Sequence, residues 1–117
     1  MQDHKFYMRE ALSQAQRAYQ AGEVPIGCVI VDEEGALIAR GYNQVEALKC
    51  QTGHAEVLAV QEACAVKKDW RLERCWVYVT VEPCSMCMNL LVLSRVAGVV
   101  YGASSPVFGY SLDNSGC

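Results

Sequence analysis

The sequence predicts an α/β domain in which helices pack on a mixed β-sheet. Two observations support this fold class. The 117 residues are 52% hydrophobic, which is enough for one real core in a chain of this size. Segments with helical and strand-like apolar spacing also follow one another in the order α-β-β-α-β-α-β, and the first two strands form a hairpin. This order implies helices that cover a mixed sheet.

The first half of the chain contains a helix and a hairpin. Apolar side chains recur at helical spacing over residues 4–21. Residues 26–32 are a β-branched apolar run, residues 33–35 are typical of a turn, and residues 36–42 return as the second strand. Residues 43–53 are polar and irregular, so we expect no regular element there.

The second half alternates helices and strands. Residues 54–66 are predicted to form a helix, and residues 75–81 are rich in the β-branched and aromatic side chains of a strand. Pro83 suits a strand-to-helix corner because it lacks a donor and fixes its own φ. Residues 84–94 then form a helix, and residues 98–101 return as the last strand.

Composition argues against several classes of protein. No apolar run reaches the roughly 18 residues of a membrane span, so we expect no membrane partner. The first ten residues lack the apolar segment of a secretory signal, which makes the cytoplasm the expected compartment. The seven cysteines are odd in number, and without an export signal we do not expect them to form disulfides.

The net charge of −3 gives no general attraction to nucleic acid. A local basic patch for RNA is still available, because Lys67, Lys68, Arg71 and Arg74 lie close together in the sequence. The alternative is an ordinary solvated loop, and charge alone favours that alternative.

The residues of a catalytic zinc site occur in two short motifs, His54-Ala55-Glu56 and Pro83-Cys84-Ser85-Met86-Cys87. Cys84 and Cys87 are three residues apart at the start of a predicted helix, so both sulfurs can reach one ion. The helix N-terminus should also lower their pKa and favour the thiolate. With His54 from another helix, three ligands leave a fourth zinc position open for water, as in catalytic sites. Glu56 then has the natural role of a proton carrier beside that water.

Each of these residues also has a simpler interpretation. A C-x-x-C pair between a strand and a helix is typical of a thioredoxin-like redox site as well. A closed structural zinc site would use Cys50 or Cys117 as its fourth ligand. Glu56 alone would be an ordinary carboxylate at a helix start, and His54 alone a structural or surface histidine. One catalytic zinc site explains all four residues together, and we favour it for that reason.

The spacing H-x-E followed by P-C-x-x-C is the signature of zinc-dependent base deaminases. The chain resembles the cytidine/deoxycytidylate deaminase superfamily and, within it, the tRNA-specific adenosine deaminases, from about residue 6 to residue 109. The resemblance extends to six further segments, Val24–Val31, Gly41-Tyr42-Asn43, Trp70-Arg71-Leu72, Val77–Cys84, Ser94-Arg95-Val96 and Val99–Ala103.

This resemblance implies a three-layer α/β/α fold, a homodimer and one zinc ion per chain, held by His54, Cys84 and Cys87. It implies hydrolytic deamination of adenosine to inosine at the wobble position of the tRNA anticodon loop. Glu56 would move protons from the water to the purine and then to the leaving amine. Asn43 would hydrogen-bond the flipped nucleoside, although asparagine also favours a turn at the end of a hairpin.

The resemblance further implies that the backbone of Ala55 contacts the base edge. Residues 1–117 would form a single zinc-dependent deaminase domain, without the C-terminal strand and helix that the family normally adds. The bulky side chains of residues 88–93 also depart from the small ones common in the family. Both departures bear on the substrate and leave the zinc chemistry intact.

The segment 70–83 and the Phe108-Gly109 pair favour tRNA deamination. Three other functions compete with it. The main alternative is a deaminase of a free base or nucleoside, of the guanine or cytosine type, which the acidic net charge favours weakly. A non-catalytic zinc subunit would be expected to lack the carboxylate of Glu56. A redox protein would not hold zinc tightly, because its dithiol must cycle through a disulfide.

Overall fold

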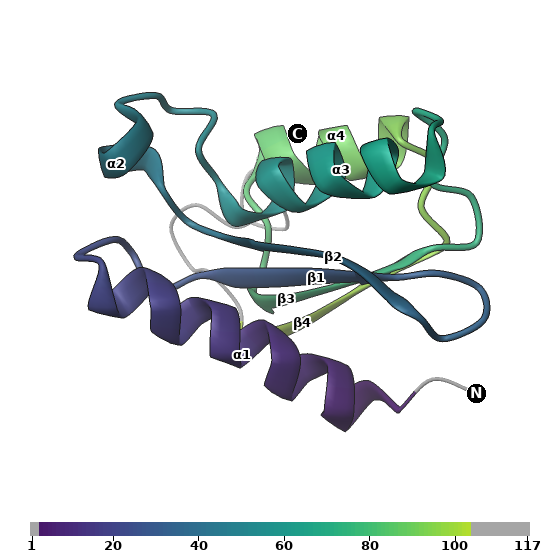
Figure 1. Ribbon diagram of the computed structural model, residues 1–117, viewed down its shortest axis with the longest axis horizontal. Helices are drawn as coiled ribbons and strands as arrows, with labels where there is room; N and C mark the ends of the chain where they lie inside the picture. Colours follow the sequence, from purple (N-terminus) through teal and green to yellow (C-terminus); the bar gives the residue numbers. More distant parts are fainter. Residues whose placement is uncertain (1–2, 104–117) are drawn as a thin grey trace, which may run out of the picture.

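A four-stranded mixed sheet forms the middle layer of the domain (Figure 1). The computed structural model describes residues 3–103. The elements are, in chain order, α1 (His4–Gln20), β1 (Gly27–Val31), β2 (Leu37–Tyr42), α2 (Val45–Leu48), α3 (Ala55–Lys67), β3 (Trp76–Val81), α4 (Ser85–Leu93) and β4 (Gly98–Ala103). The strand order is β2-β1-β3-β4; β1 is antiparallel to β2 and β3, whereas β3 and β4 are parallel. The prediction of a mixed sheet is confirmed.

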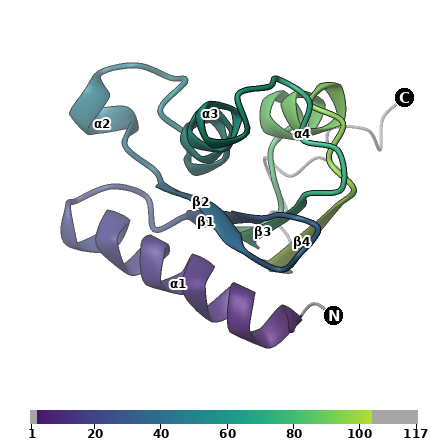
Figure 2. The same ribbon diagram turned by 45° about the vertical axis from the view of Figure 1, so that its right-hand side comes forward.

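The helices cover both faces of this sheet, which gives the three layers that were expected. Figure 2 shows α1 alone on one face and the pair α3 and α4 on the other. Beneath α1, a small core joins Tyr7 and Ala11 to strand residues such as Tyr78. The larger core lies under α3 and α4 and includes Ile30 and Leu91.

A glycine brings α3 unusually close to the sheet. A Cβ atom at Gly41 in β2 would lie 2.9 Å from the backbone nitrogen of Ala59 and closer still to the carbonyl oxygen of Ala55. Only a residue without a side chain allows this approach. Gly41 therefore fixes the height at which the N-terminal turn of α3 lies above the sheet.

One element was missed by the sequence analysis. Residues 43–53 were expected to be irregular, but Val45–Leu48 form the short helix α2. Its N-cap residue makes no side-chain capping bond. Instead, the buried carboxylate of Glu23 accepts hydrogen bonds from the backbone N–H groups of Glu46 at 3.0 Å and Ala47 at 2.8 Å. A cap supplied from more than 20 residues upstream leaves no local pattern to detect.

The other predicted elements are confirmed within a few residues of their expected ends. Within residues 3–103, no helix combines the length and the apolar character that crossing a membrane would require. The Phe108-Gly109 pair and Cys117 lie outside the described residues.

Candidate active site

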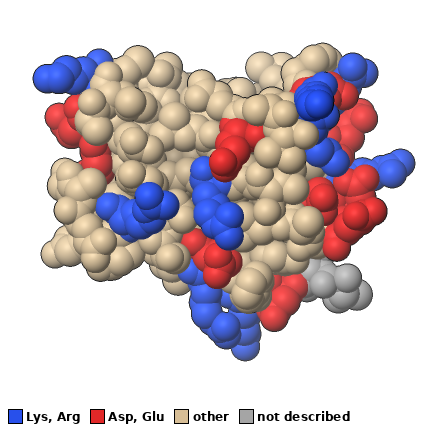
Figure 3. Space-filling model, viewed as in Figure 1, with Lys and Arg blue, Asp and Glu red and all other residues tan. Residues whose placement is uncertain are grey.

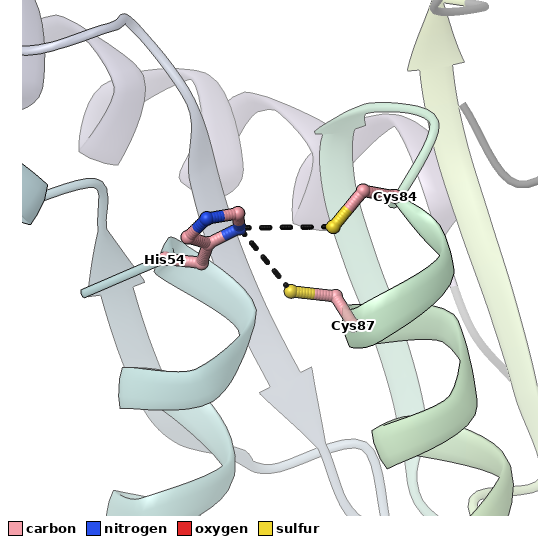
Figure 4. A group of neighbouring side chains, drawn as sticks. All are labelled: His54, Cys84 and Cys87. Carbon is pink, nitrogen blue, oxygen red and sulfur yellow. Dashed lines mark hydrogen bonds between the residues drawn. The ribbon is translucent and has the colours of Figure 1, made fainter. Parts of the chain in front are cut away.

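The three predicted metal ligands lie together at the N-terminal ends of two helices. His54 is the N-cap of α3, Cys84 is the N-cap of α4, and Cys87 is in the first turn of α4. Nδ1 of His54 is 3.8 Å from Sγ of Cys84 and 3.5 Å from Sγ of Cys87 (Figure 4). All three ligand atoms lie within 4.8 Å of one another.

These separations fit a tetrahedral zinc ion. With Zn–S distances of about 2.3 Å and Zn–N distances of about 2.0 Å, the nitrogen and each sulfur of one tetrahedron are roughly 3.5 Å apart. The observed distances of 3.5 and 3.8 Å need little adjustment to reach that geometry. Two soft sulfur ligands and one imidazole are also a donor set that zinc prefers.

Two helix N-termini point at this cluster. Neither His54 nor Cys84 makes a side-chain capping bond, so the first N–H groups of α3 and α4 receive no hydrogen bond from their N-cap side chains. The positive ends of both helix dipoles therefore face the two sulfurs. This arrangement partly offsets the negative charge that two thiolates would bring to a metal.

The protonation of two ligands follows from their surroundings. Burial lowers the pKa of His54, which keeps its ring neutral, as a metal ligand must be. The helix N-terminus was expected to lower the pKa of the thiols, but for Cys87 the structure contradicts this. Burial raises the pKa of the Cys87 thiol, and the negative charges of Glu56 and Cys84 raise it further. A bound cation would favour the thiolate form of Cys87.

Glu56 lies beside the cluster without belonging to it. It is only 3% exposed, and its carboxylate accepts a hydrogen bond from the Cys87 thiol. Burial raises the pKa of Glu56 despite that bond. A carboxyl group with a raised pKa accepts a proton more readily than an ordinary one, which suits general acid–base chemistry.

A cavity of about 720 Å³ opens beside these side chains. It is lined by His54, Glu56 and Cys84 together with Asn43. This volume is in the range of about 300–1,000 Å³ that is typical of small-molecule sites. Ala55, whose backbone was expected to contact a base, is fully buried and is not among the lining residues. Its N–H is nevertheless in the first turn of α3, between two residues that do line the cavity.

The charges around the cavity are acidic. Its lining includes four carboxylates, Glu23, Glu46, Glu56 and Glu82. Among the described residues that line it, none is a lysine or an arginine. The cavity therefore suits an uncharged group such as a base with its ribose, and phosphate groups would have to remain outside it.

One alternative from the sequence loses support in the structure. Cys50 is exposed, hydrogen-bonds Thr52 Oγ1 at 3.0 Å and is absent from the possible metal cluster, so it does not complete a closed zinc site.

The predicted basic patch is partly neutralised by acidic neighbours. Lys67 pairs with Glu33 at 3.4 Å, and Arg71 pairs with Asp69 at 3.1 Å. The patch also begins at the C-terminal end of α3, about 20 Å along this 13-residue helix from His54. On the face shown in Figure 3, basic and acidic side chains are interspersed.

Sequence reasoning missed two residues that shape the site. Gln51 lines the cavity and lies 3.4 Å from Nε2 of His54. Glu23 lines the same cavity and caps α2. A glutamine or a glutamate is common in polar segments, so the sequence gives no reason to select these two. Their role becomes visible only in the folded chain, where both line the cavity.

Comparison with known proteins identifies close relatives. The family model described as "Cytidine and deoxycytidylate deaminase zinc-binding region" matches residues 1–103. The tRNA-specific adenosine deaminase of Bacillus subtilis is 47% identical over 111 residues, which cover 95% of this chain and 68% of that protein. The chain thus spans about two thirds of the length of this relative.

Two solved structures have the same fold. One comes from a study of A-to-I editing by tRNA:A34 deaminases; it has a TM-score of 0.87, 38% identity, and coverage of 90% of this chain and 80% of that one. The other is a guanine deaminase from Bacillus subtilis, with a TM-score of 0.86, 34% identity, and coverage of 94% and 73%. The expected fold class is confirmed.

Proposed function

The chain belongs to the cytidine and deoxycytidylate deaminase family, and on that premise we propose that it deaminates adenosine to inosine at the wobble position of tRNA. The observation that carries the proposal is the cavity shared by His54, Glu56 and Cys84, in a chain 47% identical to a tRNA-specific adenosine deaminase. In the reaction, the oxygen of water bonds to C6 of adenine, the C6–N6 bond breaks and ammonia leaves. One water is consumed for each ammonia released.

His54, Cys84 and Cys87 would hold one zinc ion. Their mutual distances and their nitrogen and sulfur donors support this assignment. When bound, zinc supplies Lewis-acid activation of the attacking water at neutral pH. The three side chains fix the position of that chemistry against one wall of the cavity.

Glu56 would carry the protons. Its carboxylate takes one proton from the attacking water and delivers it to N1 of the purine ring. It then takes the remaining proton from the new C6 hydroxyl and delivers it to the departing amine, so that ammonia leaves as the C6 carbonyl forms. Burial supports this role, because it raises the pKa of Glu56 and keeps bulk water away from the transferred proton.

Asn43 and the backbone of Ala55 would orient the nucleoside. Asn43 lines the cavity next to the cluster, and its backbone N–H is fixed by the carbonyl of Ile26 at 3.1 Å. The target nucleotide would be flipped out of the anticodon loop so that its base enters the cavity. The acidic lining keeps the phosphate backbone at the surface.

The direct test is mass spectrometry of an anticodon stem-loop with a wobble adenosine after incubation with the zinc-loaded protein. We expect inosine at that position, and no inosine with Glu56→Ala, which should still bind one zinc per chain. Loss of zinc from Glu56→Ala would show that Glu56 is a ligand and not the proton carrier. No inosine from zinc-loaded, folded protein would refute the substrate assignment.

A free-base deaminase is the second candidate, because a guanine deaminase shares the fold with a TM-score of 0.86. The acidic cavity would also admit an uncharged free base. Release of ammonia from guanine, but not from the stem-loop, would favour this candidate. Both substrates should be assayed with the same enzyme preparation and with Glu56→Ala as the blank.

We also propose that two chains form a homodimer through α4. Its residues Val92 and Leu93 are 60% and 65% exposed, and a second copy would cover this apolar surface. Leu93→Asp should yield monomers in light scattering. Leu12→Asp makes the same change at an exposed leucine of α1 and should leave the protein dimeric. A monomeric parent protein would refute the proposal.

Residues 1–117 would contain one such deaminase domain, and the protein would act in the cytoplasm. The tRNA substrate supports that compartment. The six described cysteines, all free thiols, are also compatible with its reducing conditions.

A further inference from the structure

Gln51 lies on the side of the His54 ring that faces away from the cysteines. Its amide nitrogen is 3.4 Å from Nε2 of His54. The other ring nitrogen, Nδ1, is directed at the sulfurs of Cys84 and Cys87, as Figure 4 shows. The two nitrogens of one imidazole thus have different partners.

These partners constrain where the ring proton can be. A neutral imidazole carries one proton, and the nitrogen that binds a metal must be the unprotonated one. If Nδ1 binds the metal, Nε2 carries the hydrogen and needs an acceptor. An amide oxygen is an acceptor, and a half-turn of the Gln51 amide exchanges its oxygen and nitrogen within the same volume.

The loop that carries Gln51 is held in place by its own backbone. Gln44 N–H donates to the carbonyl of Gly53 at 2.7 Å, and Gly53 N–H donates to the carbonyl of Cys50 at 3.0 Å. These bonds close the segment on both sides of Gln51. The contact with His54 is therefore made by a side chain on a fixed backbone.

We propose that Gln51 is a positioning residue for His54, whose Nε2–H donates to the Gln51 amide oxygen when the metal is bound. This inference rests on the zinc site proposed above. The bond selects the tautomer with an unprotonated Nδ1 and holds the ring toward Cys84 and Cys87. With the amide nitrogen toward Nε2, the opposite tautomer is favoured, and its Nδ1–H faces the two sulfurs.

The test compares three variants by their zinc dissociation constants, measured in competition with a chromophoric chelator. Gln51→Leu removes both the donor and the acceptor, and should weaken zinc binding roughly 10- to 100-fold. Gln51→Glu retains only acceptors, and should bind zinc at least as tightly as the parent. Gln61→Leu makes the same change at an exposed glutamine of α3, and should have no effect.

A second readout follows the ring proton itself. The chain has two histidines, so nitrogen-15 NMR signals of His54 and His4 can be assigned by a single His4→Gln variant. In the zinc-loaded parent, the Nε2 hydrogen of His54 should exchange slowly with water. In Gln51→Leu the same hydrogen should exchange faster, while the melting temperature of the metal-free protein stays unchanged because Gln51 is exposed.

The outcomes separate this inference from the proposed function. Equal zinc affinities of the parent and Gln51→Leu would overturn the role of Gln51 and leave the zinc site intact. Binding by Gln51→Glu as weak as that by Gln51→Leu would refute the acceptor role. A parent protein that binds no zinc would overturn both the inference and the zinc site beneath it.

Discussion

Gly41→Ala should separate the two halves of the proposed zinc site. The added Cβ would lie 2.9 Å from the Ala59 nitrogen, where ordinary contact begins at 3.4 Å, so α3 must rise by at least 0.5 Å, the difference between the two. The even closer carbonyl of Ala55 requires more. Metal ligands tolerate errors of only about 0.2 Å. Because α3 carries His54 and α4 carries both cysteines, the shift should weaken zinc binding roughly tenfold or more.

The same substitution should lower the free energy of unfolding by about 1–3 kcal/mol, as overpacking does. For a chain of this size, that corresponds to a fall in melting temperature of roughly 4–12 °C. Gly22→Ala is the matched control. Gly22 has a φ of +79° and no atom within 4 Å of an added Cβ, so its substitution strains the backbone without moving α3. Both variants should melt earlier, but only Gly41→Ala should lose zinc affinity in chelator competition. Parent-like zinc binding by Gly41→Ala would refute the argument.

Three further predictions concern single side chains of the site. Cys87→Ala should lose zinc, as measured by metal analysis of the purified protein, and should lose much of its stability; one retained zinc per chain would mean that Cys87 is not a ligand. Asn43→Ala should reduce kcat/KM about tenfold or more, the equivalent of one lost hydrogen bond, with little change in melting temperature. A broad loss of stability would instead identify Asn43 as a turn residue. Burial raises the pKa of Glu56 in the folded, metal-free protein above the ordinary value of 4.5. At pH values just above 4.5 the folded chain therefore still holds a proton that the unfolded chain has released. Stability should therefore fall as the pH rises above that value, and Glu56→Gln should remove this fall in unfolding curves measured from pH 4 to 8; an identical pH dependence of both proteins would contradict it.

The sequence predicted the elements whose signals are local. The apolar spacing of residues 4–21 marks α1 because one helix face alone meets the sheet. The three side chains that form the possible metal cluster could also be singled out from the sequence, since a histidine at one helix start and two cysteines at another have few other common uses. In both cases a short stretch of chain contains the whole pattern.

Features that depend on distant contacts could not be predicted in this way. Helix α2 has its cap from Glu23, and Lys67 has its charge partner in Glu33, 34 residues away. The pKa of Cys87 rises chiefly through burial, and burial is a property of the folded chain. The same reasoning explains why Gln51 was overlooked until its distance to His54 was known.

The placement of the ligands also has a consequence for the order of events during synthesis. His54 and Cys84 are 30 residues apart, and α3 and β3 lie between them in the chain. A nascent chain that has left the ribosome only as far as α3 offers a single ligand from this cluster and cannot retain the ion. The full set of proposed ligands thus becomes available only after β1, β2 and β3 have been synthesised, but before β4, so zinc could bind while the last strand is still to be added.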